Sequence, residues 1–155
     1  MKQLAILKNM KEDHVTLFQR LFERYSFRSG TVVVEQGAPA DYFYLVISGK
    51  AQVSFKPYDG TPITVSHVGK DSLFGWSAVV GSPTYTSSVT VVEDIETYRI
   101  HGSRLRNLCV NHPEAGKDIL DRLANIVSSR WNNAHEQVKS ILAQGMQNNY
   151  TVPHN

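Results

Sequence analysis

Apolar residues divide the chain into three zones by their spacing. In the first zone they recur at helical intervals, at Val15, Leu17, Phe18, Leu21, Phe22 and Tyr25. Asn9 followed by Glu12 has the pattern of a capping pair at the start of such a helix. We therefore expect an N-terminal helix that Gly30 ends.

The second zone, about Thr31 to Ile100, is rich in Val, Ile, Thr and Tyr, and Gly, Pro and Asp interrupt it at short intervals. This composition is typical of short strands joined by tight turns, as in a sandwich or barrel. Hairpin turns are expected at Ser48-Gly49-Lys50 and Tyr58-Asp59-Gly60, and a strand–turn–strand at Val91 to Ile95. The expected strands are Thr31–Glu35, Tyr42–Ser48, Ala51–Lys56, Ile63–His67, Ser87–Val92 and Ile95–Ile100.

The third zone is helical again. Ser103 has the character of a cap for a short helix through Cys109 and Val110, and His112-Pro113-Glu114 starts a long helix. The long helix carries a seven-residue apolar repeat, formed by Leu120, Ala124, Val127, Trp131, Ala134, Val138 and Ile141. The polar segment 144–155 is expected to be a flexible tail, which leaves 1–143 as one domain.

Composition supports an ordinary globular domain. The 155 residues are 41% hydrophobic and 19% charged with a net charge of +2, so nothing favours disorder or a strongly charged partner. No apolar stretch approaches the roughly 20 residues that span a bilayer, and the N-terminus lacks a secretory pattern. Cys109 is the only cysteine, so an intrachain disulfide is excluded, and we expect a cytoplasmic protein without membrane association.

Three motifs follow one another in the chain: Gly37 to Ala51, Leu73-Phe74-Gly75 with Ser87-Ser88-Val89, and Val92 to Ile100. Together they resemble the cyclic nucleotide-binding domain family, and the resemblance covers roughly residues 10 to 142. The stretch Gly37 to Ala51 resembles the family signature of a glycine turn, Ala-Asp, an apolar strand and a second glycine turn. Leu73-Phe74-Gly75, followed by Ser87-Ser88-Val89, matches the frame of its phosphate-binding cassette, and Val92 to Ile100 is similar to its closing strand pair. The resemblance implies a mainly β fold with flanking helices: a double-stranded β-helix, or jelly roll, with a cupin-like shape, an N-terminal helix and a long C-terminal helix.

In the family that this chain resembles, an acid directly after Phe-Gly holds the ribose, and an arginine later in the loop pairs with the cyclic phosphate. Here those two positions fall on Trp76 and Tyr85, so both charged anchors are missing. Losing a charge-assisted phosphate contact costs about 1.5–3 kcal/mol, so we expect weak or non-standard nucleotide binding. The candidate cassette residues are Phe74, Gly75, Trp76, Ser77, Ala78, Tyr85, Thr86 and Ser87.

Two functions remain open. The first is a stand-alone regulatory sensor of the Crp/Fnr-like type that binds a cyclic nucleotide or another small nucleotide-like ligand and signals to an unknown protein partner. The second is a ligand-free interaction or dimerisation module whose pocket is plugged by Trp76. For Trp76 itself the alternatives are this plug or an aromatic face that stacks on a ligand.

The C-terminal helix also has two interpretations. Its apolar seam either packs on its own roll or, as the resemblance implies, forms a homodimer. The seam is followed by no basic recognition helix, so DNA binding through a helix-turn-helix is not expected.

Enzymatic activity is not expected. The histidines are scattered, and His67 lacks the His-x-His partner of a metal-binding cupin. Gly75 to Val79 lacks the second glycine of a nucleophile elbow, and Cys109 lies in an apolar helix where it is more often buried than reactive.

Overall fold

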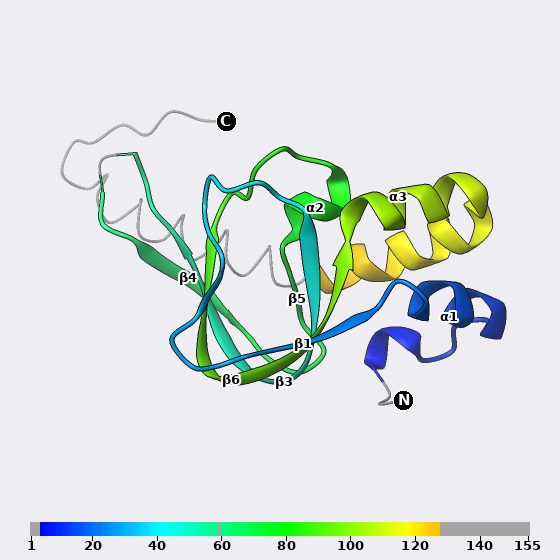
Figure 1. The fold of residues 1–155 in the computed structure, drawn as a ribbon, viewed down its shortest axis with the longest axis horizontal. Coiled ribbons are helices and arrows are strands. Elements are labelled where there is room, and N and C mark those ends of the chain that lie inside the picture. The colour runs from blue at the N-terminus through cyan, green and yellow to red at the C-terminus, as the bar shows by residue number, and fades with distance from the viewer. Residues whose placement is uncertain (1–3, 59, 128–155) are drawn as a thin grey trace.

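The computed structural model describes residues 4–58 and 60–127 (Figure 1). Helices gather at one end of a β-structure, and the β3–β4 hairpin extends from the other end (Figure 1). A further helix, described from 113 to 127, follows the last labelled element. In chain order the elements are η1 (Ala5–Leu7), α1 (Glu12–Gln19), β1 (Glu23–Phe27), β2 (Val32–Val34), β3 (Tyr42–Phe55), β4 (Ile63–Val68), β5 (Leu73–Phe74), α2 (Trp76–Val80), β6 (Ser88–His101) and α3 (Gly102–Asn111).

All strand pairs are antiparallel, and the long pair β3–β6 is the centre of the sheet. The main path runs β1-β6-β3-β4, while β2 pairs with β6 and β5 pairs with β3. The β3–β6 ladder extends from Tyr42 opposite His101 to Ser54 opposite Ser88. This mainly β roll with flanking helices confirms the expected jelly-roll architecture.

The expected turns at Ser48-Gly49-Lys50 and within Val91 to Ile95 are wrong, because both segments lie inside 14-residue strands. Gly49 has a φ of +92°, and a Cβ there would lie 2.3 Å from the backbone oxygen of Asp94. The two segments therefore face each other across one ladder, whose register shifts between Val46 and Ala51. Gly49 in β3 and the pair Glu93-Asp94 in β6 therefore mark a bend shared by the two strands, and neither strand reverses its direction there.

The N-terminal helix is shorter than its apolar spacing predicted. It ends at Gln19, and Tyr25 lies in β1, where it pairs with Thr97 of β6. Aromatic residues favour strands as much as helices when a partner edge is available, so tertiary pairing decided the conformation. Asn9, with a φ of +61°, is not the cap, since Lys11 occupies that position without a side-chain bond.

The cap of α3 also differs from its prediction. His101 takes the N-cap position, and its Nδ1 accepts a hydrogen bond of 3.3 Å from the backbone N–H of Ser103. Ser103 is therefore the capped residue.

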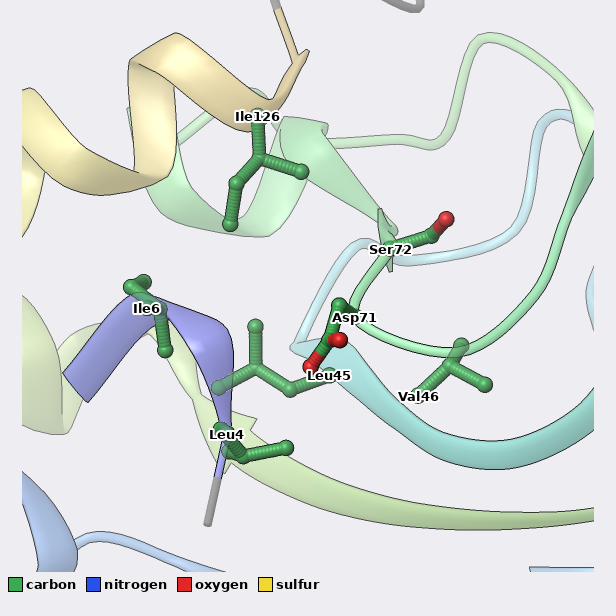
Figure 2. A pocket seen from close by; sticks show the side chains of 7 residues that line it. All are labelled: Leu4, Ile6, Leu45, Val46, Asp71, Ser72 and Ile126. Atoms are coloured by element: carbon green, nitrogen blue, oxygen red, sulfur yellow. The ribbon is translucent and has the colours of Figure 1, made fainter. Parts of the chain in front are cut away.

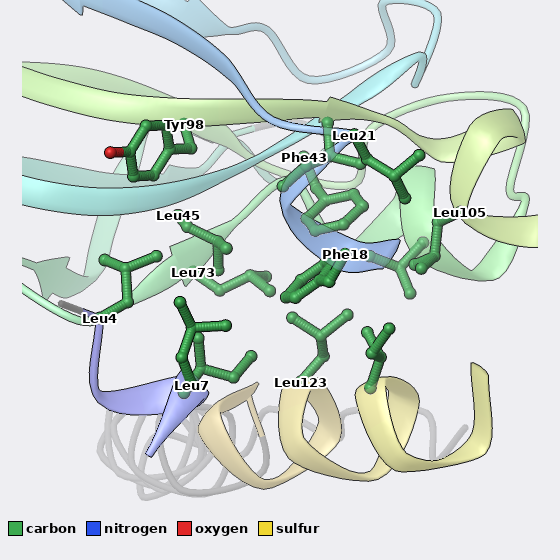
Figure 3. Close-up of a cluster of buried hydrophobic side chains, with 14 of the residues drawn as sticks. Leu4, Leu7, Phe18, Leu21, Phe43, Leu45, Leu73, Tyr98, Leu105 and Leu123 are labelled. Carbon is green, nitrogen blue, oxygen red and sulfur yellow. The ribbon is translucent and has the colours of Figure 1, made fainter. Parts of the chain in front are cut away.

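Strand alternation gives the domain two cores. Phe43, Leu45 and Ile47 of β3 point to the helices and belong to the helical cluster, which includes Phe18, Leu105 and Leu123 (Figure 3). Tyr44 and Val46 point the other way into the roll cluster. The roll cluster comprises Val34, Tyr44, Val46, Ala51, Val53, Val65, Val68, Phe74, Tyr85, Val89, Val91 and Ile95.

The C-terminal helix packs on its own domain through a face only partly shared with the predicted seam. Ile119 and Leu123 are fully buried, Val127 is buried beside them, and Ala124 is exposed. Of the predicted seam, Leu120 is half-buried and packs against the helical cluster. The seam residues Trp131, Ala134, Val138 and Ile141 and the tail 144–155 lie outside the described residues.

Gly116 allows this helix to lie directly on α3. A Cβ at Gly116 would come within 2.8 Å of the Sγ of Cys109. Burial raises the pKa of the Cys109 thiol, so its nucleophilic thiolate form is disfavoured at neutral pH.

Three charged or polar side chains fix the same helix to the N-terminal segment. Asp118 accepts hydrogen bonds of 2.8 Å from Arg122 Nε and shares one of 2.8 Å with Nδ1 of His14, which is only 5% exposed. The guanidinium of Arg122 also donates to the carbonyl oxygens of Ile6, Lys8 and Asn9. The hydrogen bonds from Arg122 and then from His14 hold the pKa of Asp118 below its ordinary value.

We expect Asp118→Asn to lower the free energy of unfolding by about 1–2 kcal/mol at pH 7, because two charged hydrogen bonds weaken at a partly screened site. A depressed pKa makes this stabilisation present above about pH 4 and lost as the pH falls through the folded pKa. Urea unfolding at pH 7 and pH 3 measures both effects. Asp121→Asn, which breaks the exposed pair with Lys117, is the control and should change little. Equal effects of the two substitutions would contradict this account.

Candidate functional site

The cassette helix α2 is short because a glycine in the left-handed region stands at each end. Gly75 has a φ of +84° and Gly81 a φ of +79°. A Cβ at Gly75 would lie 2.8 Å from the backbone oxygen of Tyr42, so only glycine permits this approach to β3. The predicted cassette frame is thus seated against the first residues of β3.

The loop after α2 is held by the Gly37–Ala40 turn through backbone hydrogen bonds. Gly37 N–H donates to Tyr85 O at 2.9 Å, and Tyr85 N–H donates to Ala38 O at the same distance. Ala40 N–H donates to Pro83 O at 3.0 Å. The first glycine-turn motif of the sequence therefore has a local role, which is to fix the cassette loop.

Tyr85, which the sequence comparison with the family predicts to stand in place of its arginine, turns into the roll. Its ring belongs to the roll cluster and is 8% exposed. Its hydroxyl donates a hydrogen bond of 2.6 Å to Tyr42 O and accepts one of 3.2 Å from Tyr42 N–H. Burial raises the pKa of this phenol, so Tyr85 is a neutral link between the cassette loop and β3.

Trp76, at the position of the missing acid, faces the other core. It is half-buried and packs against the helical cluster, so Tyr85 and not Trp76 fills the roll interior. Ala78 is fully buried in the same cluster, and its carbonyl oxygen accepts a hydrogen bond of 2.6 Å from Arg106 of α3. A Cβ at Gly102 would lie 2.1 Å from that oxygen, so α2 and α3 are in direct contact.

The remaining predicted cassette residues take different positions. Phe74 is buried in the roll and stacks on Tyr44 with ring centroids 4.8 Å apart. Ser77 is buried, and its carbonyl accepts the N–H of Ser82 at 2.9 Å. Thr86 is exposed and Ser87 half-buried. The structure therefore brings Phe74 and Tyr85 together in the roll and directs Trp76 and Ala78 to the helices.

Sequence reasoning missed a cation in the roll. Arg99 of β6 lies between the rings of Tyr25 and Tyr42, with its guanidinium carbon 4.0 and 4.1 Å from their centroids. His101 packs edge-on against Tyr42 at 5.0 Å between centroids. The sequence could have revealed this position, because successive side chains of a strand point to opposite faces. Arg99 lies between the apolar Tyr98 and Ile100 and therefore points to the face opposite theirs.

Tyr44 is the most perturbed phenol of this cluster. Burial, followed by the neighbouring Tyr85, raises the pKa of Tyr44 to about 12, although the charge of Arg99 acts in the opposite direction. The folded state therefore favours the neutral phenol.

A raised pKa contributes stability that is complete below pH 10 and is lost as the pH rises towards 12. The wild type should lose about 1 kcal/mol more unfolding free energy than Tyr44→Phe between pH 9 and pH 11. Urea unfolding across this range gives the comparison. Tyr58→Phe, which changes a ring that is 98% exposed, should follow the wild type. Parallel curves for the wild type and Tyr44→Phe would contradict the assignment.

A separate shallow depression lies where η1, β3 and the C-terminal helix meet (Figure 2). Its lining is Leu4, Ile6, Leu45, Val46, Asp71, Ser72 and Ile126. Asp71 already accepts a hydrogen bond of 3.0 Å from the N–H of Ala5. None of the cassette residues contributes to this depression.

A roll with a short helix between two glycines at its side, and further helices packed on that helix, has the architecture of a cyclic nucleotide-binding domain. The family model for the cyclic nucleotide-binding domain matches residues 24–112. The chain belongs to this family, as the resemblance implied.

The chain is 23% identical over 129 residues to the CRP-like cAMP-activated global transcriptional regulator of Mycobacterium tuberculosis. The match covers 83% of this chain and 58% of that regulator, so the chain spans little more than half of its length.

Two solved structures share the fold. A cyclic nucleotide-binding domain from Methylobacillus flagellatus has a TM-score of 0.78 at 17% identity, covering 97% of this chain and 80% of its own. A regulatory subunit of a cAMP-independent protein kinase A from Trypanosoma brucei has a TM-score of 0.69 at 15% identity, covering 89% and 47%. That second structure is of a substituted variant bound to cAMP, and one of its changes replaces threonine by arginine.

In the part of the chain that the structure describes, no helix is long and apolar enough to cross a bilayer. Within the same residues, no group of three or more His, Cys, Asp and Glu side chains could hold a metal ion.

Proposed function

We propose that this domain is a regulatory sensor that binds a small nucleotide-like ligand in its roll, with non-standard or weak affinity for ordinary cyclic nucleotides. The observation that carries the proposal is the exchange at Tyr85, where a neutral phenol bonded to Tyr42 replaces the family's phosphate-binding arginine. The frame of the cassette is kept, but its charge is not.

The route for a signal follows from the contacts of α2. Arg106 and Gly102 join α3 to the carbonyl of Ala78, and Gly116 joins the C-terminal helix to α3. A ligand that moves α2 would therefore shift the helices, provided that it binds one helix arrangement more tightly than another. We infer a non-enzymatic role, with a protein partner or a homodimer as the output.

A second candidate, a ligand-free interaction module, has one observation in its favour. Tyr44, Phe74 and Tyr85 already pack together inside the roll. The residue that fills the pocket in this alternative is Tyr85, in place of Trp76.

A thermal-melt series with cAMP, cGMP and cyclic di-GMP separates the two candidates. A ligand present at about 100 times its dissociation constant stabilises the folded state by roughly 2.7 kcal/mol. A series in which none of these ligands shifts the melting temperature would favour the ligand-free module.

Restoring the family's anchors should create cyclic-nucleotide binding. We expect the double variant Trp76→Glu, Tyr85→Arg to bind cAMP at least tenfold more tightly than the wild type, because a charge-assisted phosphate contact is regained. Isothermal titration provides the dissociation constants.

The matched control for that design is Trp76→Glu combined with Thr86→Arg, which places the cation on the exposed neighbour. This variant should bind no better than the wild type. Equal cAMP affinity in the wild type and in both double variants would count against the cassette assignment.

We further propose that the seam of the C-terminal helix forms a homodimer. Ala124 is exposed and Leu120 half-buried, so this stripe is available beside the face that packs on the roll. Ala124→Arg should shift the protein from dimer to monomer in sedimentation equilibrium, because a charge would be buried at a close helix contact. Asn125→Arg, at the adjacent exposed position, is the control. A dimer unaffected by Ala124→Arg would refute this interface.

Two expectations stay predictions. We expect a cytoplasmic location, because the sequence has a single cysteine. We also expect the domain to act as an independent regulatory unit.

A further inference from the structure

Arg99 is arranged so that only the edge of its guanidinium is available. The rings of Tyr25 and Tyr42 lie over the group at 4.0 and 4.1 Å, which uses its faces in cation–π contacts. The in-plane N–H groups interact in part with the hydroxyl of Tyr44, and Nε stays without a hydrogen-bond partner. The fork of these groups matches the oxygens of a phosphate or carboxylate. The geometry therefore selects for an oxoanion at this edge.

One donor of that fork is unsatisfied. Among the described residues, Nε of Arg99 is a buried side-chain nitrogen without a hydrogen-bond partner. Glu23 Oε1 lies 3.4 Å away, within ion-pair distance but without hydrogen-bond geometry. The Glu23 side chain is 46% exposed, so this pair contributes little and can separate. A buried donor left unpaired is unfavourable, and a better acceptor would recover that free energy.

This cation lies beside the cassette. Residues directly opposite in a sheet share a face, and Glu23, Arg99, Tyr44 and Phe74 form one such row across β1, β6, β3 and β5. Phe74 immediately precedes the cassette glycine, Gly75. Tyr42, whose ring covers Arg99, bears the backbone groups that hold the Tyr85 hydroxyl. One side chain therefore separates Arg99 from the position of the lost cassette arginine.

We propose that Arg99 is the anion anchor of this domain and takes the phosphate group of a nucleotide-like ligand, displacing Glu23. The existence of a ligand rests on the proposed function, whereas the oxoanion site rests on Arg99 itself. A free phosphate and a phosphate ester share the chemistry, and the test separates them.

The test combines two measurements on the full chain. Correlation spectra of the arginine Nε–H groups, with the Arg99 signal assigned from its loss in Arg99→Lys, report contact during addition of inorganic phosphate, cAMP, cGMP or cyclic di-GMP. Isothermal titration gives the dissociation constant of each probe for the wild type and for Arg99→Lys, Glu23→Gln and Arg24→Gln. Thermal melts establish that each variant is folded.

The matched control is Arg24. It lies on β1 next to Glu23 but pairs with Glu96 at 2.6 Å and faces Tyr98 of the helical cluster. We expect Arg99→Lys to weaken binding by tenfold or more, because lysine keeps the charge but loses the fork. Glu23→Gln should tighten binding severalfold by removing the competing carboxylate, and Arg24→Gln should stay within twofold of the wild type.

Each outcome decides a different point. Nucleotide binding that Arg99→Lys leaves unchanged overturns the anchor while the sensor proposal stands. Movement of the Arg99 signal with inorganic phosphate but with no nucleotide supports the anchor and overturns the nucleotide sensor. Absence of any response to all four probes overturns both. Tighter binding in Glu23→Gln, with weaker binding in Arg99→Lys, supports the displacement of Glu23.

Discussion

The bend in the β3–β6 ladder is the constraint on which the rest of the domain depends. Every other strand pairs with one of these two, so the shape of the sheet is the shape of this ladder. Gly49 makes the bend possible, because a side chain there would collide with the backbone of Asp94. Alternation along the bent strands then separates an interior face from a helical face. The cassette lies between these faces, with Phe74 turned to the roll and Ala78 turned to the helices.

Tyr85, where the resemblance places the family's arginine, changes which partners the interior of the roll requires. A buried cation without its anion would be costly, whereas a neutral phenol with two backbone hydrogen bonds is satisfied. The interior therefore closes on itself around Tyr44, Phe74 and Tyr85. The cation of the roll is instead Arg99, which two aromatic rings and Glu23 partly compensate at a position that solvent reaches. A positively charged side chain therefore lies near the cassette, but on β6.

How much of this the sequence could predict depends on whether a feature is local. The short helix of the cassette frame could be predicted, because glycines lie at both ends of α2. The assignment of Trp76 and Tyr85 to the family's anchor positions follows from counting along the sequence and stays a prediction. The bend at Gly49 was misread as a hairpin, since a left-handed glycine serves both structures and only the partner strand distinguishes them. The directions of Trp76 and Tyr85 depend on packing at long range. The alternation of residues along β6 could have predicted the face on which Arg99 lies. Its contacts with two aromatic rings could not be predicted, because the rings come from β1 and β3, which are distant in the sequence.

Two routes join the roll to the C-terminal helix, and they start from different elements. One runs from α2 through the Ala78 carbonyl and Arg106 into α3. The other starts at Glu23, the first residue of β1, and reaches α1, whose His14 bonds to Asp118 of the C-terminal helix. If a ligand's anion displaces Glu23 from Arg99, the second route is affected first, because β1 follows α1 after a three-residue connection. The N-terminal helix would then transmit the signal, a role that the family's cassette arginine, located after α2, would not give it.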